Sequence, residues 1–162
     1  MPDPLIIVSA CLVGVECTYE GGCETRPDLL GALAGCAILP VCPEVEGGLG
    51  VPRPRAEVEG GDGTAVLDGG AAVRTAAGTD VTGAYLRGAH AALDLARAAD
   101  VRVAVLKSRS PSCGSRGIND GTHTRTLRPE GVGVTAALLA RNGIRVVGED
   151  CDPDAVRVLA AR

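Results

Sequence analysis

Cysteines are the residues of this sequence with the most chemistry to offer. The chain has seven, and three of them, Cys11, Cys17 and Cys23, recur every six residues in the segment SACLVGVECTYEGGC. No two cysteines form a Cys-x-x-Cys pair, which argues against a zinc ribbon or a thioredoxin-type motif. Thiolates are ligands for zinc and for iron–sulfur clusters. The three neighbours therefore act either as one metal-binding unit or through a single member with distant partners.

The elements that must position these thiols begin with four short apolar runs, which are typical of buried strands. The runs are continuous rather than alternating, as expected when helices cover both faces of a parallel sheet. They are LIIVSA (5–10), AILPVC (37–42), VRVAVLKS (101–108) and IRVVGE (144–149). We therefore expect an α/β fold with a mostly parallel sheet flanked by helices, Rossmann-like or flavodoxin-like in layout.

Helical patterns lie between and after these runs. They cover residues 27–35, 80–99, 132–143 and 152–161. The longest, 80–99, carries one apolar stripe and has Thr79 or Asp80 as its expected cap: the stripe is Val81, Tyr85, Ala89, Ala92 and Ala96. Between 60 and 78 the pattern changes, and TAVLDGGAAVRTAAG predicts a small β-hairpin inserted in the fold and turned at Asp68-Gly69-Gly70. With no linker or repeat in the sequence, residues 1–162 are expected to form one domain.

Three cysteines fall at the ends of three predicted strands. Cys11 follows the first strand, Cys42 ends the second, and Cys113 lies in the loop SRSPSCGSRG after the third. Ligands of open α/β sheets bind outside the carboxyl ends of the strands. The three thiols are therefore expected to converge on one point.

Polar residues accompany two of these cysteines. Glu44 lies two residues beyond Cys42. The loop around Cys113 carries two serines and three basic residues: Ser110, Ser112, Lys107, Arg109 and Arg116. This local positive charge in an acidic protein suits an anionic cluster or a phosphate-bearing ligand.

The composition argues against several classes of function. Aromatic residues make up 1% of the chain and the formal net charge is −4, so binding to nucleic acid is not expected. The N-terminal segment lacks a basic region, and its apolar run is too short to span a membrane. We expect a cytoplasmic protein without membrane attachment, in which seven reduced cysteines serve metal binding, thiol chemistry or burial.

Five motifs in this order give the sequence a family resemblance. They are SACLVGVEC, PVCPEVEGGL followed by PR, GTDVT, LKSRSPSCG and GVGVTAALL, and together they resemble the iron–sulfur-dependent thiouracil desulfidase family across residues 5–149. The resemblance implies a 4Fe–4S cluster held by Cys11, Cys42 and Cys113, with one iron open for the substrate's sulfur. Cys11 would then act with distant partners, apart from Cys17 and Cys23.

The same resemblance implies a non-redox hydrolysis of the C=S group of a thiolated pyrimidine, such as 2-thiouracil, 4-thiouracil or 4-thiouridine monophosphate. Glu44 is the candidate base and Ser110 its partner, and four residues are candidates for substrate binding: Lys107, Arg53, Arg109 and Ser112. Thr18, Asn119 and His123 depart from the usual pattern of the family, which bears on substrate fit rather than on the cluster.

Two other readings stay open at this point. One is a non-catalytic iron–sulfur or zinc protein, and the other is a metal-free sulfur carrier that uses Cys17 or Cys113. For Cys36 and Cys151 a structural role is expected, since free cysteines are often simply buried. The sequence leaves open the ring position of the sulfur, the choice among free base, nucleotide and tRNA, and the oligomeric state.

Overall fold

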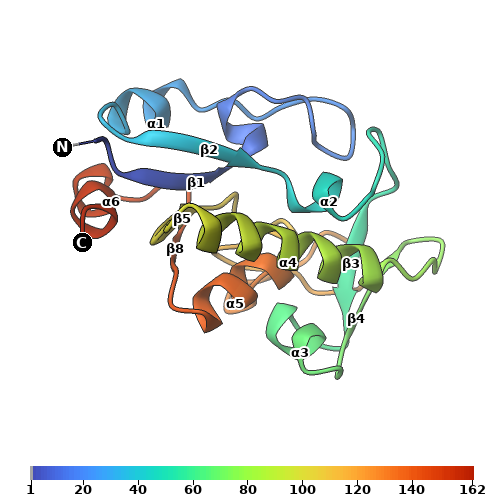
Figure 1. Ribbon diagram of the computed structural model, residues 1–162. Helices are drawn as coiled ribbons and strands as arrows, with labels where there is room; N and C mark the ends of the chain where they lie inside the picture. Colours follow the sequence, from blue (N-terminus) through green and yellow to red (C-terminus); the bar gives the residue numbers. More distant parts are fainter. Residues whose placement is uncertain (1) are drawn as a thin grey trace.

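Four parallel strands form the central sheet of the computed structural model, which describes residues 2–162 (Figure 1). They are β1 (Leu5–Ser9), β2 (Ala37–Val41), β5 (Val103–Val105) and β8 (Arg145–Val147), in the spatial order β2-β1-β5-β8. In register, Val8 lies opposite Pro40 on one side and Val105 on the other. All four predicted strands are present, each shorter than its apolar run, and the expected α/β fold class is confirmed.

Helices cover both faces of this sheet. They are α1 (Pro27–Ala32), α2 (Pro43–Glu46), α3 (Gly63–Leu67), α4 (Thr82–Ala98), α5 (Val134–Arg141) and α6 (Pro153–Ala160), with a 3-10 turn η1 at Ala10–Val13. In Figure 1, α1 and α6 lie on one side of the sheet and α4 and α5 on the other. Across residues 2–162, no helix combines the length and apolar character needed to cross a membrane.

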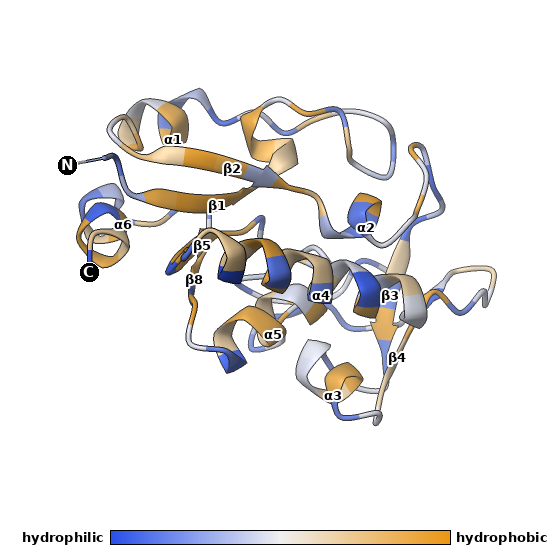
Figure 2. Ribbon diagram, viewed as in Figure 1, coloured by the Kyte–Doolittle hydropathy of each residue, from blue (hydrophilic) through white to orange (hydrophobic). Residues whose placement is uncertain are grey.

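The continuous apolar runs are explained by two cores, one on each face. Alternate residues of β1 enter opposite cores: Ile6 and Val8 pack toward α1 and α6, and Ile7 packs toward α4 and α5. Figure 2 shows β1 as an apolar strand, while hydrophilic residues gather on outer parts of the helices. Burial on both faces removes the alternation that a half-exposed strand would show.

The apolar stripe predicted for the long helix is the stripe that α4 buries. Tyr85, Ala89, Ala92 and Ala96 are all buried. Just before the helix, Asp80 Oδ1 accepts a hydrogen bond from the backbone N–H of Thr82 at 2.9 Å. The helix therefore begins at Thr82, two residues after Asp80, and the Asp80 carboxylate satisfies one free N–H of its first turn.

The small antiparallel pair is present, but its arms differ from the predicted hairpin. β4 (Ala72–Thr75) pairs with β3 (Ala56–Glu59), not with residues 64–67, which form α3. The side chain of Asp62 accepts hydrogen bonds from the N–H groups of Thr64 and Ala65 at 3.0 and 3.3 Å. This cap starts a helix where the apolar residues alone suggested a strand. A second short pair, β6 (Ile118–Asn119) and β7 (Leu127–Arg128), had no signal in the sequence.

A close backbone contact between α2 and α4 determines where α2 lies. A Cβ atom added to Gly88 of α4 would overlap the carbonyl oxygen of Pro43, and one added to Gly47 would overlap that of Ala84. Both positions therefore require glycine. Because α2 carries Glu44, this backbone contact fixes the predicted catalytic carboxylate against α4.

We expect Gly88→Ala to destabilise the fold. Overpacking of this kind lowers the free energy of unfolding by about 1–3 kcal/mol, which corresponds to a fall in Tm of roughly 3–10 °C. Gly31→Ala is the matched control, because a Cβ there meets nothing within 4 Å and alanine favours the helix. Calorimetry of both variants checks this, and an unchanged Tm for Gly88→Ala would contradict the packing argument.

Candidate functional site

A pocket opens at the carboxyl edge of the parallel sheet. Its volume is about 270 Å³, and its walls come from the segments that follow β1, β2 and β5 and from the strand β3. All nine residues predicted for metal, catalysis or substrate line it: Cys11, Cys42, Cys113, Glu44, Ser110, Ser112, Lys107, Arg53 and Arg109. Arg116 and His123 are not among the lining residues. The roles of the nine stay predictions, but the structure does bring them together.

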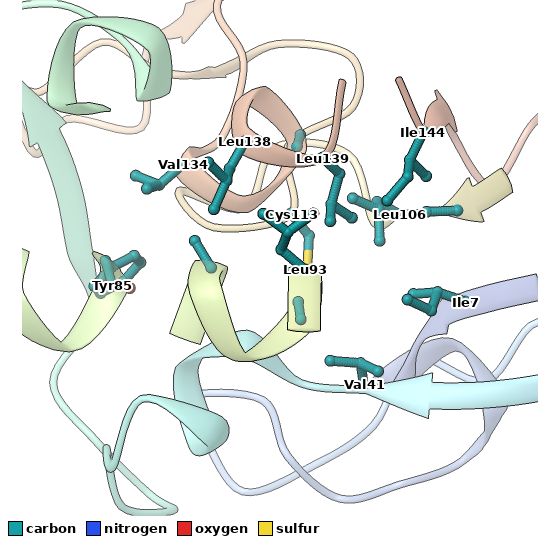
Figure 3. Close-up of a cluster of buried hydrophobic side chains, with 14 of the residues drawn as sticks. Ile7, Val41, Tyr85, Leu93, Leu106, Cys113, Val134, Leu138, Leu139 and Ile144 are labelled. Atoms are coloured by element: carbon teal, nitrogen blue, oxygen red, sulfur yellow. The ribbon is translucent and has the colours of Figure 1, made fainter. Parts of the chain in front are cut away.

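Each of the three predicted ligands stands where one strand ends. Cys11 lies in η1 immediately after β1, and Cys42 lies between β2 and α2. Cys113 follows β5 in a longer loop and is only 5% exposed, with its side chain beside Leu93 in the core (Figure 3). The sheet therefore supplies the convergence that the strand-end argument predicted.

The thiols of the pocket influence one another. Burial raises the pKa of Cys11 to about 11, with further increases from Glu24 and Cys42. Burial together with Cys42 and Cys11 raises the pKa of Cys17 to about 12. Burial also raises the pKa of Cys113 strongly, and Cys11, Glu44 and Cys42 add to it, while a hydrogen bond with Ser9 opposes it. Without a metal these thiols are protonated at neutral pH.

The chemistry of this donor set, in which the shared type of atom is a thiol sulfur from Cys11, Cys42 and Cys113, is compatible with an iron–sulfur cluster. Three thiolates around one zinc, with bonds of about 2.3 Å, would lie roughly 3.8 Å apart. In the part of the chain that the structure describes, no group of three Cys, His, Asp or Glu side chains is gathered closely enough to hold one metal ion. In a 4Fe–4S cluster each thiolate binds a different iron, so the sulfurs stand farther apart. Neither histidine lines the pocket.

Cys17 is a fourth thiol in the same wall. It is buried and lines the pocket, and its carbonyl oxygen lies 3.8 Å from Cys42 Sγ. Cys23, six residues later, is exposed and outside the pocket. Of the three evenly spaced cysteines, two therefore belong to the site and one does not.

Glu44 is the most constrained carboxylate of the pocket. It is 8% exposed, and its Oε2 lies 2.7 Å from Arg53 Nε and 2.6 Å from Arg53 Nη2. Its Oε1 accepts a hydrogen bond from Ser112 Oγ at 3.0 Å, and Ser112 Oγ lies 3.0 Å from Ser110 Oγ. A hydrogen-bonded chain of two hydroxyl groups therefore leads from the carboxylate to Ser110 at the pocket wall.

The guanidinium of Arg53 is committed to the protein. Besides Glu44 it donates to the carbonyl oxygen of Cys17 at 2.8 Å and to that of Gly50 at 3.2 Å. Its side chain is 7% exposed. Most of its donors are thus satisfied by groups of the protein itself.

Lys107 is also paired, whereas Arg109 is not. Lys107 Nζ lies 3.4 Å from both Glu24 Oε2 and Glu149 Oε1. Glu149 accepts hydrogen bonds from the N–H and hydroxyl of Ser108 at 2.8 and 2.7 Å, and although burial opposes it, these bonds keep its pKa below the usual value. Arg109 is exposed and forms no ion pair within residues 2–162.

Several residues of the site carried no recognisable signal in the sequence. Tyr85, expected only as part of an apolar stripe, lies close to Glu44, and burial together with that carboxylate raises its pKa well above normal. Three further lining residues, Ser9, Tyr19 and Arg55, were not singled out. Only the placement of Tyr19 two residues after Cys17 and of Arg55 in the PRPR segment would have drawn attention to them.

Comparison with known proteins agrees with this geometry. A curated relative, the uncharacterized protein YbbK of Bacillus subtilis (strain 168), is 41% identical over 146 residues, which span 90% of this chain and 96% of the relative. A solved structure of the 4Fe–4S-dependent thiouracil desulfidase TudS is similar with a TM-score of 0.81 and 42% identity, covering 97% of this chain and 98% of that one. The family model described as 2-thiouracil desulfurase matches residues 6–151. The chain therefore belongs to the 2-thiouracil desulfurase family.

Proposed function

We propose that this protein is a 4Fe–4S-dependent desulfidase that hydrolyses the C=S group of thiolated pyrimidines. The observation that carries the proposal is the meeting of Cys11, Cys42 and Cys113 in one pocket with a buried carboxylate. The solved TudS structure, a 4Fe–4S-dependent thiouracil desulfidase at 42% identity, supports it. Both the cluster and its three-cysteine ligation are part of the proposal.

In this mechanism Cys11, Cys42 and Cys113 would hold the cluster. The cluster supplies a soft Lewis acid that suits a thiocarbonyl sulfur. The overall reaction adds water across the C=S carbon: a C–O bond forms, the C–S bond breaks with its electron pair on sulfur, and sulfur leaves as hydrosulfide. No atom changes its oxidation state, so no external reductant or oxidant is required.

The protein's own groups handle the protons. Glu44 takes a proton from the attacking water through Ser112 and Ser110, whose hydroxyl groups form the chain described above. The same chain returns a proton to the departing sulfur or to the ring. Arg53 holds the carboxylate in place through its ion pair, with Nη2 lying 2.6 Å from Glu44 Oε2.

The charges of the pocket favour a small ligand over a polyanion. Arg53 and Lys107, two of the predicted substrate cations, already have carboxylate partners. Arg109 is the remaining cation, which suits a free base or a nucleotide with one phosphate group. We keep 2-thiouracil, 4-thiouracil and 4-thiouridine monophosphate as the candidate substrates, and nucleic acid and membranes as unexpected partners. The three thiols must be reduced to bind iron, which suits a cytoplasmic enzyme.

The two other readings are weaker on this geometry. A zinc protein needs a tight ligand group that residues 2–162 do not provide. A metal-free sulfur carrier needs a thiolate at neutral pH, but burial raises the pKa of Cys17 to about 12 and raises that of Cys113 as well. Metal binding removes this obstacle, because ligand thiols lose their protons to the metal.

The first experiment measures metal and sulfide in protein purified without oxygen. We expect about four iron and about four acid-labile sulfide per chain, with little zinc, and release of hydrosulfide from 2-thiouracil or 4-thiouridine monophosphate. Cys113→Ser should lose most of the iron, whereas Cys23→Ser and Cys36→Ser should keep it. Stoichiometric zinc, or no metal after reconstitution, would overturn the proposal, and normal iron in Cys113→Ser would remove that ligand.

Glu44→Gln tests the proton-handling role. We expect kcat to fall about 10²- to 10⁴-fold at normal iron content, because glutamine keeps the shape but accepts no proton. Glu46→Gln is the matched control on the exposed side of α2. Ser112→Ala keeps the Glu44–Arg53 pair but removes the hydroxyl that links Glu44 to Ser110 and also contacts Cys113 Sγ at 3.8 Å; it should lower kcat as well, and its iron content is measured alongside. Wild-type turnover in both site variants would exclude this chain from the mechanism.

Alkylation of metal-free protein tests the sulfur-carrier reading. At pH 8 a thiol with a pKa of about 11, as in Cys11, is roughly 0.1% thiolate, so labelling by iodoacetamide should be slow and should rise about tenfold per pH unit up to pH 10. The exposed Cys23 should label first, and urea-unfolded protein should label evenly. Peptide mapping by mass spectrometry checks the order. Rapid labelling of Cys17 or Cys113 at neutral pH would instead favour the carrier.

A further inference from the structure

Two side chains of the pocket are used by none of the steps above. Tyr19 and Asn119 both line the cavity, and within residues 2–162 neither side chain forms a hydrogen bond. Tyr19 is one of only two tyrosines in the chain, and Asn119 is one of only two asparagines. An aromatic face and a free carboxamide thus border the space in which the reaction is proposed to occur.

The backbone holds Tyr19 firmly in the wall. It lies in a turn in which Gly21 N–H donates to the carbonyl of Thr18 at 2.9 Å and Thr18 N–H donates to that of Gly22 at 3.1 Å. The hydroxyl of Thr18 accepts a further bond from Gly22 N–H at 3.0 Å. From the other side, Arg53 N–H donates to the carbonyl of Tyr19 at 2.9 Å. The ring is therefore presented with little backbone freedom to lose on binding.

Asn119 is held as firmly, through a buried carboxylate. It pairs with Leu127 in the β6–β7 ladder. The loop that follows is anchored to Glu57, only 1% exposed, whose Oε1 accepts bonds from the N–H groups of Gly121 and His123 at 3.1 Å each. A Cβ added to Gly121 would overlap the carbonyl oxygen of Val58, and its φ is +88°. The side chain of His123 contacts Glu59, with Nε2 lying 2.9 Å from Oε1, and it is not among the residues that line the pocket.

We propose that Tyr19 and Asn119 recognise the pyrimidine ring: the ring stacks on Tyr19, and the carboxamide of Asn119 binds the edge beside the C=S group. This inference rests on the proposed function and deepens it. In a thiouracil that edge carries N3–H, a donor, and the second ring carbonyl, an acceptor. Asn119 Oδ1 accepts from N3–H while Nδ2 donates to the carbonyl, a two-bond pairing of the kind asparagine makes with nucleobases. Aromatic stacking completes a recognition mode common for unpaired bases.

The symmetry of the ring gives this assignment a consequence for substrate range. In 2-thiouracil the N3–H lies between C2=S and C4=O, and in 4-thiouracil it lies between C4=S and C2=O. Either sulfur can therefore point to the same place while Asn119 meets the same donor and acceptor. The two compounds should have similar Michaelis constants, whereas methylation of N3 removes the donor from both.

The test uses cluster-loaded enzyme with uracil as an unreactive binding probe and 2-thiouracil as substrate. Asn119→Ala should weaken uracil binding and raise the substrate's Michaelis constant about tenfold to hundredfold, with kcat and iron content nearly unchanged. Tyr19→Leu should weaken binding by a similar factor and Tyr19→Phe should not, because stacking needs the ring and not the hydroxyl. Asn142→Ala, at the end of α5, is the matched control.

A substrate variant tests the edge contact without relying on the protein variants alone. N3-methyl-2-thiouracil should be a poor ligand for wild-type enzyme, and Asn119→Ala should no longer distinguish it from 2-thiouracil. Unchanged Kd values in both Asn119→Ala and Tyr19→Leu would overturn the inference while leaving the desulfidase proposal intact. Conversely, weakened uracil binding in these variants with no hydrosulfide from wild-type enzyme would refute the proposed function and support the ring contacts.

Discussion

A charged carboxylate can be buried only when cations and hydrogen-bond donors take the place of the water that would otherwise solvate it. The contacts that meet this requirement hold the walls of the pocket together. Three carboxylates at or behind its walls are buried: Glu44, which lines the pocket, and Glu57 and Glu149. Each has a cationic partner: Arg53 for Glu44, Arg55 for Glu57 and Lys107 for Glu149. Loss of one partner would leave a buried charge unsatisfied. The pairs therefore bind the loops to the sheet edge more firmly than exposed ion pairs would.

Each of these carboxylates orders a different part of the site. Glu44 accepts a hydrogen bond from the Ser112 hydroxyl and so holds the loop that carries Cys113. Glu57 accepts hydrogen bonds from two backbone N–H groups of the loop after Asn119, and Glu149 accepts one from the backbone N–H of Ser108. The Arg53 side chain also donates a hydrogen bond to the carbonyl oxygen of Cys17, which links Cys17 to Glu44 through Arg53. Preorganisation of this kind leaves a cofactor or a ring little ordering to do on binding.

Local patterns were enough to predict the sheet, the main helices and the gathering of the thiols. Strand ends of a parallel sheet share one edge, so Cys11, Cys42 and Cys113 could be brought together without knowing any contact. The hairpin was wrong in its arms because an Asp62 cap outweighed β-like residues in 64–67. The long-range contacts of the buried carboxylates could not be predicted, for another reason. Glu57 and Gly121 are 64 residues apart, and nothing in the local sequence of either segment indicates the other.

The order of the strands in the sheet has a consequence for how the protein matures. β1 lies between β2 and β5, so one of its edges has no neighbour until residues 103–105 have been synthesised. Cys113 emerges later still, and Glu149, which anchors the Ser108 segment, comes almost at the end of the chain. A ribosome-bound fragment presents the first two thiols on an incomplete sheet. The proposed cluster can therefore gain its third ligand only after Cys113 and the Glu149 segment that anchors Ser108 have been synthesised, and the first two thiols have to stay reduced until then.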